Sequence, residues 1–370
     1  MKIKSVAFGF LMYVILKTAF LGSGMSYIFS TSLTSSVFCI IVGFLISFIF
    51  LFLIYKLINI LPEYSIIEKI NILFKGPSKI FINVSLFIIS LLSAIFAFSS
   101  ICNFVTIEFL DNTPKILICL LLFITIFYLS QKDVEVLSRF ALIGGSICFI
   151  SFVLNNLSLL SYIDISNLKP YLSEQPIDLI KATITFAILF SGPMFFLTMI
   201  PRKCIVEDNK KFRKNMIFFF SLSGGELIII FFTVLCVLGI DITRLYNYSV
   251  FVVLRNINVL NFLENVEDVA AVRWFIYLTI SVTLSIMFAK EEINICYKVK
   301  NKKLLSYLIC GGVFIVSFIL INFNYNFDVG SYVIVPLLLF SYLILITFIV
   351  LIKYYFYKNK KTFCDTNNNL

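Results

Sequence analysis

The sequence contains no histidine at all and little charge, since only 14% of its 370 residues are Asp, Glu, Lys or Arg. The lack of histidine excludes zinc–histidine sites, Ser-His-Asp triads and histidine proton relays. The nine cysteines are scattered without Cys-x-x-Cys spacing, so we interpret them as small buried apolar residues. We therefore expect no enzyme, and no catalytic residue, metal or cofactor.

Hydrophobic residues, in contrast, make up 60% of the chain, and its mean hydropathy is +1.02. A water-soluble domain of this length needs more charge on its surface, so the composition predicts an all-α integral membrane protein. A transmembrane helix needs about 20 apolar residues. Ten stretches within residues 1–355 qualify: 5–32, 35–58, 80–104, 115–131, 138–160, 179–200, 215–240, 273–289, 304–322 and 331–352.

The basic residues indicate the orientation of these spans. Ten spans place both termini on one side, which then holds 23 of the 30 Lys and Arg residues, against six on the other. Cytoplasmic loops carry the excess of positive charge, so both termini are expected in the cytoplasm. Arg273, at the start of the eighth span, counts among the six outer residues. Because this asymmetry accounts for the net charge of +10, no nucleic-acid partner is expected.

Three segments outside the spans have recognisable patterns. Segment 241–272 carries apolar residues at helical spacing and is predicted to form one or two extracytoplasmic amphipathic helices. Segment 56–79 is predicted to form an amphipathic helix at the inner membrane surface, beginning after Pro62. The polar segment 356–370 is predicted to be a disordered cytoplasmic tail.

Two of the spans contain residues that interrupt helices. Span one has "GSG" at 22–24, and span six has "SGP" at 191–193. Interruptions at matching positions of two halves are typical of inverted-repeat transporters with discontinuous helices, so spans one and six predict a 5+5 repeat. The freed backbone groups need a polar cavity, and an unwound helix start can hold a carboxylate. The predicted ligand-binding residues are Gly22, Ser23, Gly24, Phe190, Ser191, Gly192 and Pro193.

Each of these features also has a purely structural interpretation. Glycines permit close packing between membrane helices, and a proline produces an ordinary kink. Glu226 in span seven is either a proton-coupling residue or a helix-packing residue. Lys17 in span one either takes the place of a coupling cation near the break or extends to the membrane surface.

Five stretches resemble, in order and with matching spacing, the B subunits of spore germinant receptors, within the amino acid/polyamine/organocation superfamily. They are "LPEYSIIEKINILFKG" (61–76), "DNTPKILICLLLF" (111–123), "KDVEVLSRFALI" (132–143), "DISNLKPYL" (164–172) and "NFLENVEDVAAVRW" (261–274). The last is the most telling match. The residues that carry it are Arg255, Phe262, Leu263, Glu264, Glu267 and Trp274.

The resemblance implies a LeuT-like fold and a multi-pass subunit of a receptor in the spore inner membrane or cell membrane. It implies recognition of a small germinant, such as an amino acid, and two partners, a larger membrane subunit and a lipoprotein subunit. Two other functions remain open at this point. One is an amino-acid permease coupled to protons or sodium, and the other is a membrane scaffold that binds no ligand.

Overall fold

The computed structural model describes residues 2–20, 23–110, 112–170, 174–255, 266–297, 299–322 and 329–367. The elements in this part of the chain are helices. It also contains one isolated β-bridge, which pairs Ile3 with Ile205. The elements are α1 (Ser5–Ile15), η1 (Thr18–Phe20), α2 (Ser23–Ser32), η2 (Leu33–Ser35), α3 (Ser36–Asn59), α4 (Ile66–Leu73), α5 (Pro77–Glu108), α6 (Lys115–Ser130), α7 (Val134–Leu159), η3 (Leu160–Tyr162), η4 (Ile165–Leu168), α8 (Pro176–Ser191), η5 (Gly192–Met199), η6 (Arg202–Cys204), α9 (Asn209–Thr243), α10 (Ser249–Arg255), α11 (Val266–Tyr297), α12 (Lys302–Asn322) and α13 (Val329–Asn367).

Eight helical segments of the described chain are long and apolar enough to cross a membrane, which agrees with a multi-pass membrane protein. One of them is the continuous run Ser23–Asn59, which joins α2, η2 and α3. Two further apolar helical segments, Ser5–Phe20 and Lys115–Ser130, are shorter. Helices therefore occupy all ten predicted ranges, although two of these ranges hold helices below the usual spanning length.

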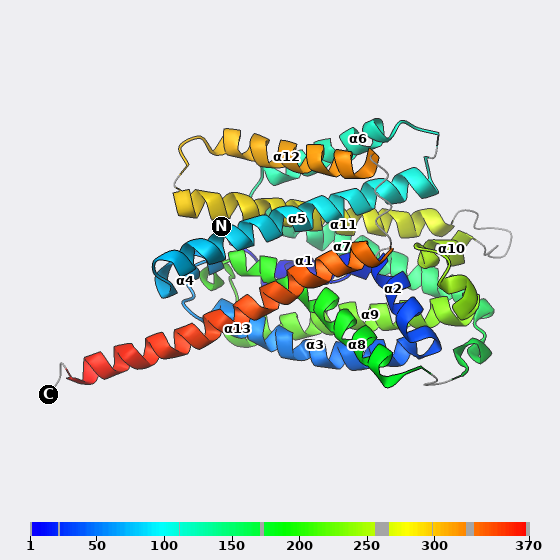
Figure 1. Ribbon diagram of the computed structural model, residues 1–370, viewed down its shortest axis with the longest axis horizontal. Coiled ribbons are helices and arrows are strands. Elements are labelled where there is room, and N and C mark those ends of the chain that lie inside the picture. The colour runs from blue at the N-terminus through cyan, green and yellow to red at the C-terminus, as the bar shows by residue number, and fades with distance from the viewer. Residues whose placement is uncertain are drawn as a thin grey trace.

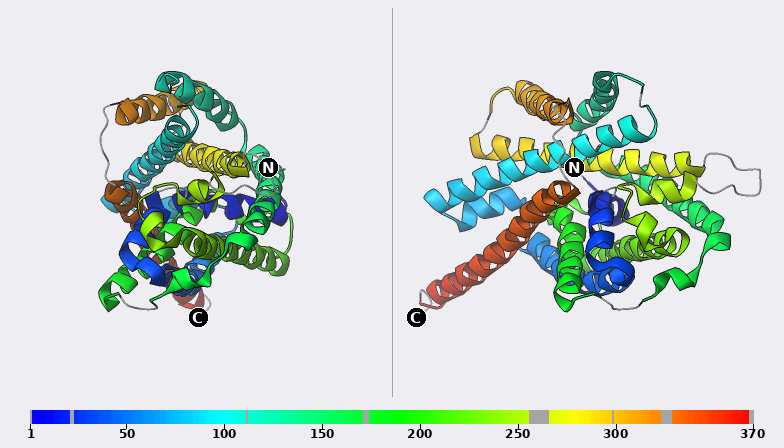
Figure 2. Two further views of the ribbon diagram at one scale, coloured as in Figure 1. Left: turned by 90° about the vertical axis from the view of Figure 1, so that its right-hand side faces the viewer. Right: turned by 45° about the vertical axis from the view of Figure 1, so that its right-hand side comes forward.

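The helices form two neighbouring groups (Figure 1 and Figure 2). α5, α6, α11 and α12 share one core of buried apolar side chains, whereas α1, α2, α3, α8 and α9 contribute to a second and larger core. α1 packs against α7, α9 and α11, so the first half of span one is buried between the groups. Nine of its eleven residues are buried, which accounts for its short, almost entirely apolar sequence.

Span one is discontinuous, as the glycines predicted, but the interruption lies earlier in the chain. α1 ends at Ile15, and after the single turn η1 the helix resumes as α2 at Ser23. Gly24 therefore belongs to the first turn of α2. A Cβ atom at position 24 would lie 2.0 Å from the carbonyl oxygen of Ala19, so only glycine fits where the returning chain approaches its own backbone.

Span six changes from an α-helix to a 3₁₀ helix at the predicted position, and the chain does not lose its helical structure there. α8 ends at Ser191, and residues 192–199 continue as the 3₁₀ helix η5, with Pro193 in its first turn. Proline has no N–H to donate and so ends the α-helical hydrogen bonding here. A Cβ atom at Gly192 would lie 2.3 Å from Cβ of Phe340 on α13. Gly192 is thus a helix-packing residue, in agreement with the structural interpretation given above.

The N-terminal segment, η6 and the turn before α4 meet at one end of the bundle. Ile3 N–H donates to the Cys204 carbonyl at 2.8 Å, and Lys203 N–H donates to the Pro62 carbonyl at 2.9 Å. The C-terminal part of α13 extends beyond the bundle at this end (Figure 1). The two chain termini therefore lie toward the same end of the molecule.

α4 confirms the helix expected within 56–79, and a capping box defines its start. The Ser65 hydroxyl accepts from Glu68 N–H at 3.4 Å, and the Glu68 carboxylate accepts from Ser65 N–H at 2.8 Å. Lys69 of α4 is buried and donates to the carbonyls of Leu57 and Ile58 at 2.8 and 3.2 Å. Its ammonium therefore satisfies carbonyl groups at the C-terminal end of α3.

Two of the remaining predicted segments, 241–272 and 356–370, contain helix in the described part of the chain. Within 241–272, α9 continues to Thr243, and α10 buries Phe251, Val253 and Leu254 against the bundle. α13 remains helical to Asn367, whereas a disordered tail was expected from residue 356.

Candidate ligand pocket and a buried charged cluster

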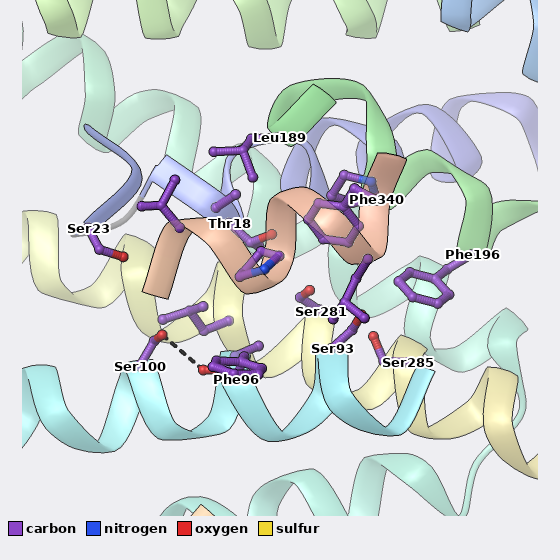
Figure 3. Close-up of a pocket in the computed structure, with 17 residues that line it drawn as sticks. Thr18, Ser23, Ser93, Phe96, Ser100, Leu189, Phe196, Ser281, Ser285 and Phe340 are labelled. Atoms are coloured by element: carbon purple, nitrogen blue, oxygen red, sulfur yellow. Dashed lines mark hydrogen bonds between the residues drawn. The ribbon is translucent and has the colours of Figure 1, made fainter. Parts of the chain in front are cut away.

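A pocket lies where the interrupted first span faces α5, α8, η5, α11 and α13 (Figure 3). The cavity has a volume of about 60 Å³. Its lining is mainly apolar, including Phe96, Phe196 and Phe340, but six hydroxyl groups also line it. These belong to Thr18, Ser23, Ser93, Ser100, Ser281 and Ser285. No charged side chain lines the pocket among the residues that the structure describes.

The hydroxyl groups differ in how their hydrogen-bonding capacity is used. The Thr18 hydroxyl donates to the Ile15 carbonyl at 2.8 Å, and the Ser100 hydroxyl donates to the Phe96 carbonyl at 2.9 Å (Figure 3). Both bond to a backbone carbonyl three or four residues earlier in the chain, as hydroxyls in membrane helices commonly do. Ser93 Oγ is buried and has no hydrogen-bond partner in the described residues. It is thus a polar group of the pocket with an unused capacity for a ligand.

Two of the seven predicted ligand-binding residues, Ser23 and Pro193, line the pocket. Gly24 forms the close backbone approach to Ala19, and Gly192 packs on Phe340. Gly22 lies outside the described residues.

The remaining two predicted ligand-binding residues are buried next to the pocket and used for packing. The Ser191 hydroxyl donates to the Ala187 carbonyl at 2.5 Å. The Phe190 ring stacks on Phe186 and packs against Phe44 and Phe220, with centroid distances of 5.0 to 5.9 Å. Of the predicted ligand-binding residues, the structure therefore places two in the pocket lining and two beside it. The serines of α5 and α11 that line the pocket were not among the predicted residues, because hydroxyls in membrane helices commonly bond to their own backbone.

A second polar site lies on the other side of the interruption, around Lys17. The Lys17 ammonium is buried, forms an ion pair with Glu226 of α9, and donates to the Tyr277 hydroxyl of α11 at 2.7 Å. It also lies 3.3 Å from the centre of the Tyr13 ring, a cation–π contact. Lys17 therefore does not extend to the membrane surface. It joins α1, α9 and α11 through charge and hydrogen bonds.

Arg273 is a member of this cluster that the sequence analysis treated only as one of the six outer basic residues. In the structure it is 3% exposed, and its guanidinium lies 3.9 Å from Glu226 Oε1. It lies one helical turn before Tyr277 on α11, a spacing that places both side chains on one face of the helix. The i, i+4 spacing of Arg273 and Tyr277 was the feature of the sequence that could have indicated that they share a site. A charge at the end of an apolar run is usually exposed, however, and only packing against α9 shows otherwise.

The cluster thus holds two cations and one carboxylate. Glu226 is the only acidic residue with an ion pair to Lys17 or Arg273 in the described chain. No group of three or more His, Cys, Asp or Glu side chains in the described ranges could hold a metal ion. Buried acids and bases in membrane proteins must be paired, and they commonly mark functional positions.

The residues of the family motif divide between the described chain and its gaps. Phe262, Leu263 and Glu264 lie outside the described residues. Trp274 is buried with its ring centre 4.3 Å from that of Phe104, in a small aromatic core that also includes Phe251. Arg255 is exposed at the end of α10, and Glu267 is partly buried in the first turn of α11.

An interrupted membrane helix beside a small hydroxyl-lined pocket is the architecture of secondary transporters. The fold agrees with this class. The chain is similar to a solved structure titled "Substrate-bound outward-open state of a Na+-coupled sialic acid symporter reveals a novel Na+-site", with a TM-score of 0.62 and 12% identity. The match covers 91% of this chain and 77% of the symporter, which has the LeuT fold.

The family follows from the sequence itself. Residues 7–326 match the family described as "Spore germination protein", the spore permeases, and the chain belongs to this family. This confirms the resemblance to spore germinant-receptor B subunits. No curated protein sequence matches the chain. Family and fold are those of permeases and transporters, not of enzymes.

Proposed function

We propose that this protein is the transporter-like subunit of a spore germinant receptor, and that it binds a small germinant, an amino acid, in the hydroxyl-lined pocket. The observation that carries the proposal is the pocket at the interrupted first span, with six hydroxyls and no charged side chain in its described lining. Such a lining suits a small ligand without net charge, because a charged ligand would have no counter-ion there. A zwitterionic amino acid meets this condition.

The start of α2 supports a carboxylate at one end of the ligand. Ser23 is the first residue of α2 and lines the pocket. The first N–H groups of a helix have no partner within the helix, and its dipole favours a negative group at this end. Phe96, Phe196 and Phe340 offer apolar surface to the remainder of the ligand. Binding would change the packing of α2 and α13 against the bundle and pass to a larger membrane subunit and a lipoprotein subunit.

The proposal includes ten spans arranged as two repeats of five, with both termini in the cytoplasm. The apolar helices at Ser5–Phe20 and Lys115–Ser130 supply the two spans beyond the eight long ones. The changes of helical form after Ile15 and Ser191 fall in spans one and six, as a 5+5 repeat requires. The end that carries η6 and α4 is rich in lysine and arginine, which favours the cytoplasmic side.

A second candidate function is an amino-acid permease coupled to protons or sodium. The buried Lys17–Glu226 pair favours it, because an ionisable pair next to a substrate pocket is what a coupling site needs. Glu226 would then carry the proton, and Glu226→Gln would abolish uptake driven by a pH gradient while leaving binding in place.

The test is paired binding and uptake of a radiolabelled amino-acid panel, with purified protein in detergent and in proteoliposomes. We expect one amino acid to bind, and Gly24→Ala to abolish this binding because the new methyl group clashes with the Ala19 carbonyl. The matched control is Gly311→Ala, where an added Cβ meets no atom within 4 Å. Folding of both variants is checked by size-exclusion chromatography.

The outcomes separate the candidates. Binding that Gly24→Ala removes, without gradient-driven uptake, supports a receptor. Concentrative uptake would make the protein a permease. No binding of any amino acid by the wild-type protein, alone or with its partner subunits, would contradict both functions and leave a scaffold.

A further inference from the structure

Glu292 of α11 is a second buried acid, and it lacks the counter-ions that Glu226 has. It lies within the apolar segment Glu267–Tyr297, one of the eight that are long enough to cross a membrane, and it is 2% exposed. Neither of its carboxyl oxygens has a hydrogen-bond partner in the described residues, and none of the ion pairs there includes it. Glu226, in contrast, pairs with both Lys17 and Arg273.

The charged side chains on the helices that pack around this part of α11 are engaged with other groups or reach the surface. Lys290 of α11 donates to the Ser130 carbonyl at 2.5 Å, and Lys69 of α4 donates to carbonyls of α3. Glu135 and Arg139 of α7 form an ion pair with each other. The other charged residues at these helix ends are at least partly exposed, and they are Glu68 of α4, Lys79 of α5, Lys132 after α6, Glu291 of α11, and Lys302 and Lys303 of α12.

These surroundings decide which cation can compensate Glu292. A buried carboxylate without a counter-ion is expensive, because it has lost its water and no positive group replaces it. No group of three or more His, Cys, Asp or Glu side chains in the described ranges could hold a metal ion here. Uptake of a proton removes the charge without any further ligand, and acids inside membranes commonly mark proton sites. A proton is therefore the cation that suits Glu292.

Glu292 lies near the end of the bundle that carries α4 and η6, where polar side chains join three helices. Asn83 of α5 donates from its amide nitrogen to Asn71 of α4 at 2.9 Å and to the Cys296 sulfur of α11 at 3.1 Å. Cys296 follows Glu292 by one helical turn, so the two side chains share a face of α11. The bonds of Asn83 thus hold α4, α5 and α11 together beside the buried acid. We call this region the α4 end.

A layer of aromatic rings separates Glu292 from the hydroxyl-lined pocket. Ser285 lines the pocket, and Glu292 follows it by seven residues on the same face of α11. Between them Phe288 is fully buried, and its ring centre lies 5.4 Å from that of Phe196 and 5.9 Å from that of Phe195. Phe196 and Ser285 lie on the same side of the pocket (Figure 3). Glu292 therefore lies beyond this layer, toward the α4 end.

We propose that Glu292 is a proton-binding site that controls the packing of the α4 end. With the proton bound, the carboxyl is neutral, and α4, α5 and α11 pack as the structure describes. When the proton passes to water, the carboxylate has to be solvated. This favours a second packing, in which α4 moves away from α11 and water enters from the α4 end. The site does not depend on a ligand in the hydroxyl-lined pocket, so this proposal stands if the germinant proposal fails.

The first measurement tests whether the carboxyl is neutral, by infrared spectroscopy of the purified full-length protein in detergent at pH 7. A protonated carboxyl and a carboxylate absorb at different frequencies. The difference spectrum between the wild type and Glu292→Gln should show the loss of one protonated carboxyl. Glu135→Gln is the matched control, because Glu135 is paired with Arg139, and it should show the loss of a carboxylate only.

The second measurement tests the opening, through the rate at which N-ethylmaleimide modifies Cys296, followed by peptide mass spectrometry. Cys204 of η6 is the reference, because it is also a partly buried free thiol at the α4 end. The ratio of the two rates corrects for the general increase of thiolate with pH. In the wild type the ratio should rise with pH, by at most about tenfold per pH unit, because opening releases one proton. A carboxylate beside Cys296 would by itself slow the reaction, so a faster reaction reports the opening.

Glu292→Gln keeps the shape of the protonated carboxyl and cannot lose a proton, so its ratio should stay low and change little with pH. Should this variant fail to fold, Glu292→Met replaces it, because an apolar side chain of similar size suits a site without hydrogen-bond partners. The proposal is overturned if the infrared difference shows the loss of a carboxylate. It is equally overturned if the ratio in the variant changes with pH as it does in the wild type, or if it does not change in either protein.

Discussion

The interrupted first span presents two different sites on its two sides. Thr18 and Ser23 face a pocket of hydroxyl and apolar groups, whereas Lys17, one residue before Thr18, faces a cluster of buried charges. The pocket has room for a ligand. The Lys17–Glu226–Arg273 cluster is packed tightly by Tyr13 and Tyr277. The residues at this interruption therefore contribute both to the hydroxyl-lined pocket and to the charged cluster that connects three helices.

The difference shows what a helix interruption provides. Here α1 ends at Ile15, and the chain then turns so that Lys17 pairs with Glu226 of α9 while Thr18 lines the pocket; α11 contributes residues to both sites. The charges lie away from the pocket, which leaves its chemistry to the neutral hydroxyls. This separation can be tested by substitutions in the charged cluster and by substitutions in the pocket.

The largest effect on stability is expected from substitutions in the Lys17–Glu226–Arg273 cluster. Glu226→Gln leaves Lys17 and Arg273 buried without a carboxylate, which should cost about 3–5 kcal/mol of stability. Lys17→Met removes one of the two cations and keeps the volume, so Glu226 retains Arg273 and the loss should be clearly smaller. Folded yield and the midpoint of thermal unfolding in detergent measure both. Equal damage from the two variants would show that Arg273 does not compensate Glu226.

A smaller effect, on ligand affinity, is expected from a substitution in the hydroxyl-lined pocket. Ser93→Ala removes a buried hydroxyl without a partner in the described residues, so stability should stay equal or rise slightly. If this hydroxyl binds the ligand, amino-acid affinity should fall about 2- to 10-fold, as the loss of one hydrogen bond predicts. Equilibrium binding of the radiolabelled amino acid measures the change.

The control for Ser93 is a serine on the same helix. Ser90→Ala removes a buried hydroxyl that donates to the Phe87 carbonyl at 2.8 Å and does not line the pocket. It should leave the affinity unchanged. An equal loss of affinity in Ser90→Ala would mean that α5 acts through its packing and that Ser93 does not contact the ligand.

The smallest effect concerns a buried lysine that has no carboxylate. Lys69 is bonded to two carbonyls only, and burial lowers its pKa from 10.5 to about 8. Between these values the unfolded chain binds more protons at this position than the folded protein does. The contribution of Lys69 to the free energy of unfolding therefore increases as the pH rises from about 8 to 10.5.

Comparison with Lys69→Met isolates this contribution from other titrating groups. The difference in unfolding midpoint, wild type minus variant, should be constant below about pH 8 and increase above it. Thermal unfolding in detergent between pH 7 and pH 10 measures this. A difference that does not change with pH would show that Lys69 stays protonated in the folded protein.

Much of the helix pattern could be predicted from the sequence, because membrane-length apolar runs have few alternatives. The interruption of span one was predicted at Gly22, Ser23 and Gly24; in the structure α1 ends at Ile15 and α2 begins at Ser23, and Gly22 lies outside the described residues. Glycine marks the place where backbone approaches backbone, here Ala19, and this need not be the place where the helix ends. In span six the same signal, Gly192, reflects packing on Phe340 of α13. The residues next to a glycine in the sequence do not show which distant residue it will contact in the fold.

The sequence by itself determined the membrane class, the helical ranges and the family, because hydropathy, charge asymmetry and short motifs are local properties of the chain. Only the tertiary structure decided that Lys17, Glu226 and Arg273 form one cluster, and that serines of α5 and α11 line the pocket beside Ser23. Lys17 and Tyr277, which are hydrogen-bonded in the cluster, are 260 residues apart in the sequence. The reason is physical: charges and hydroxyls in a membrane must find partners, and the packing of distant helices determines which partners are within reach.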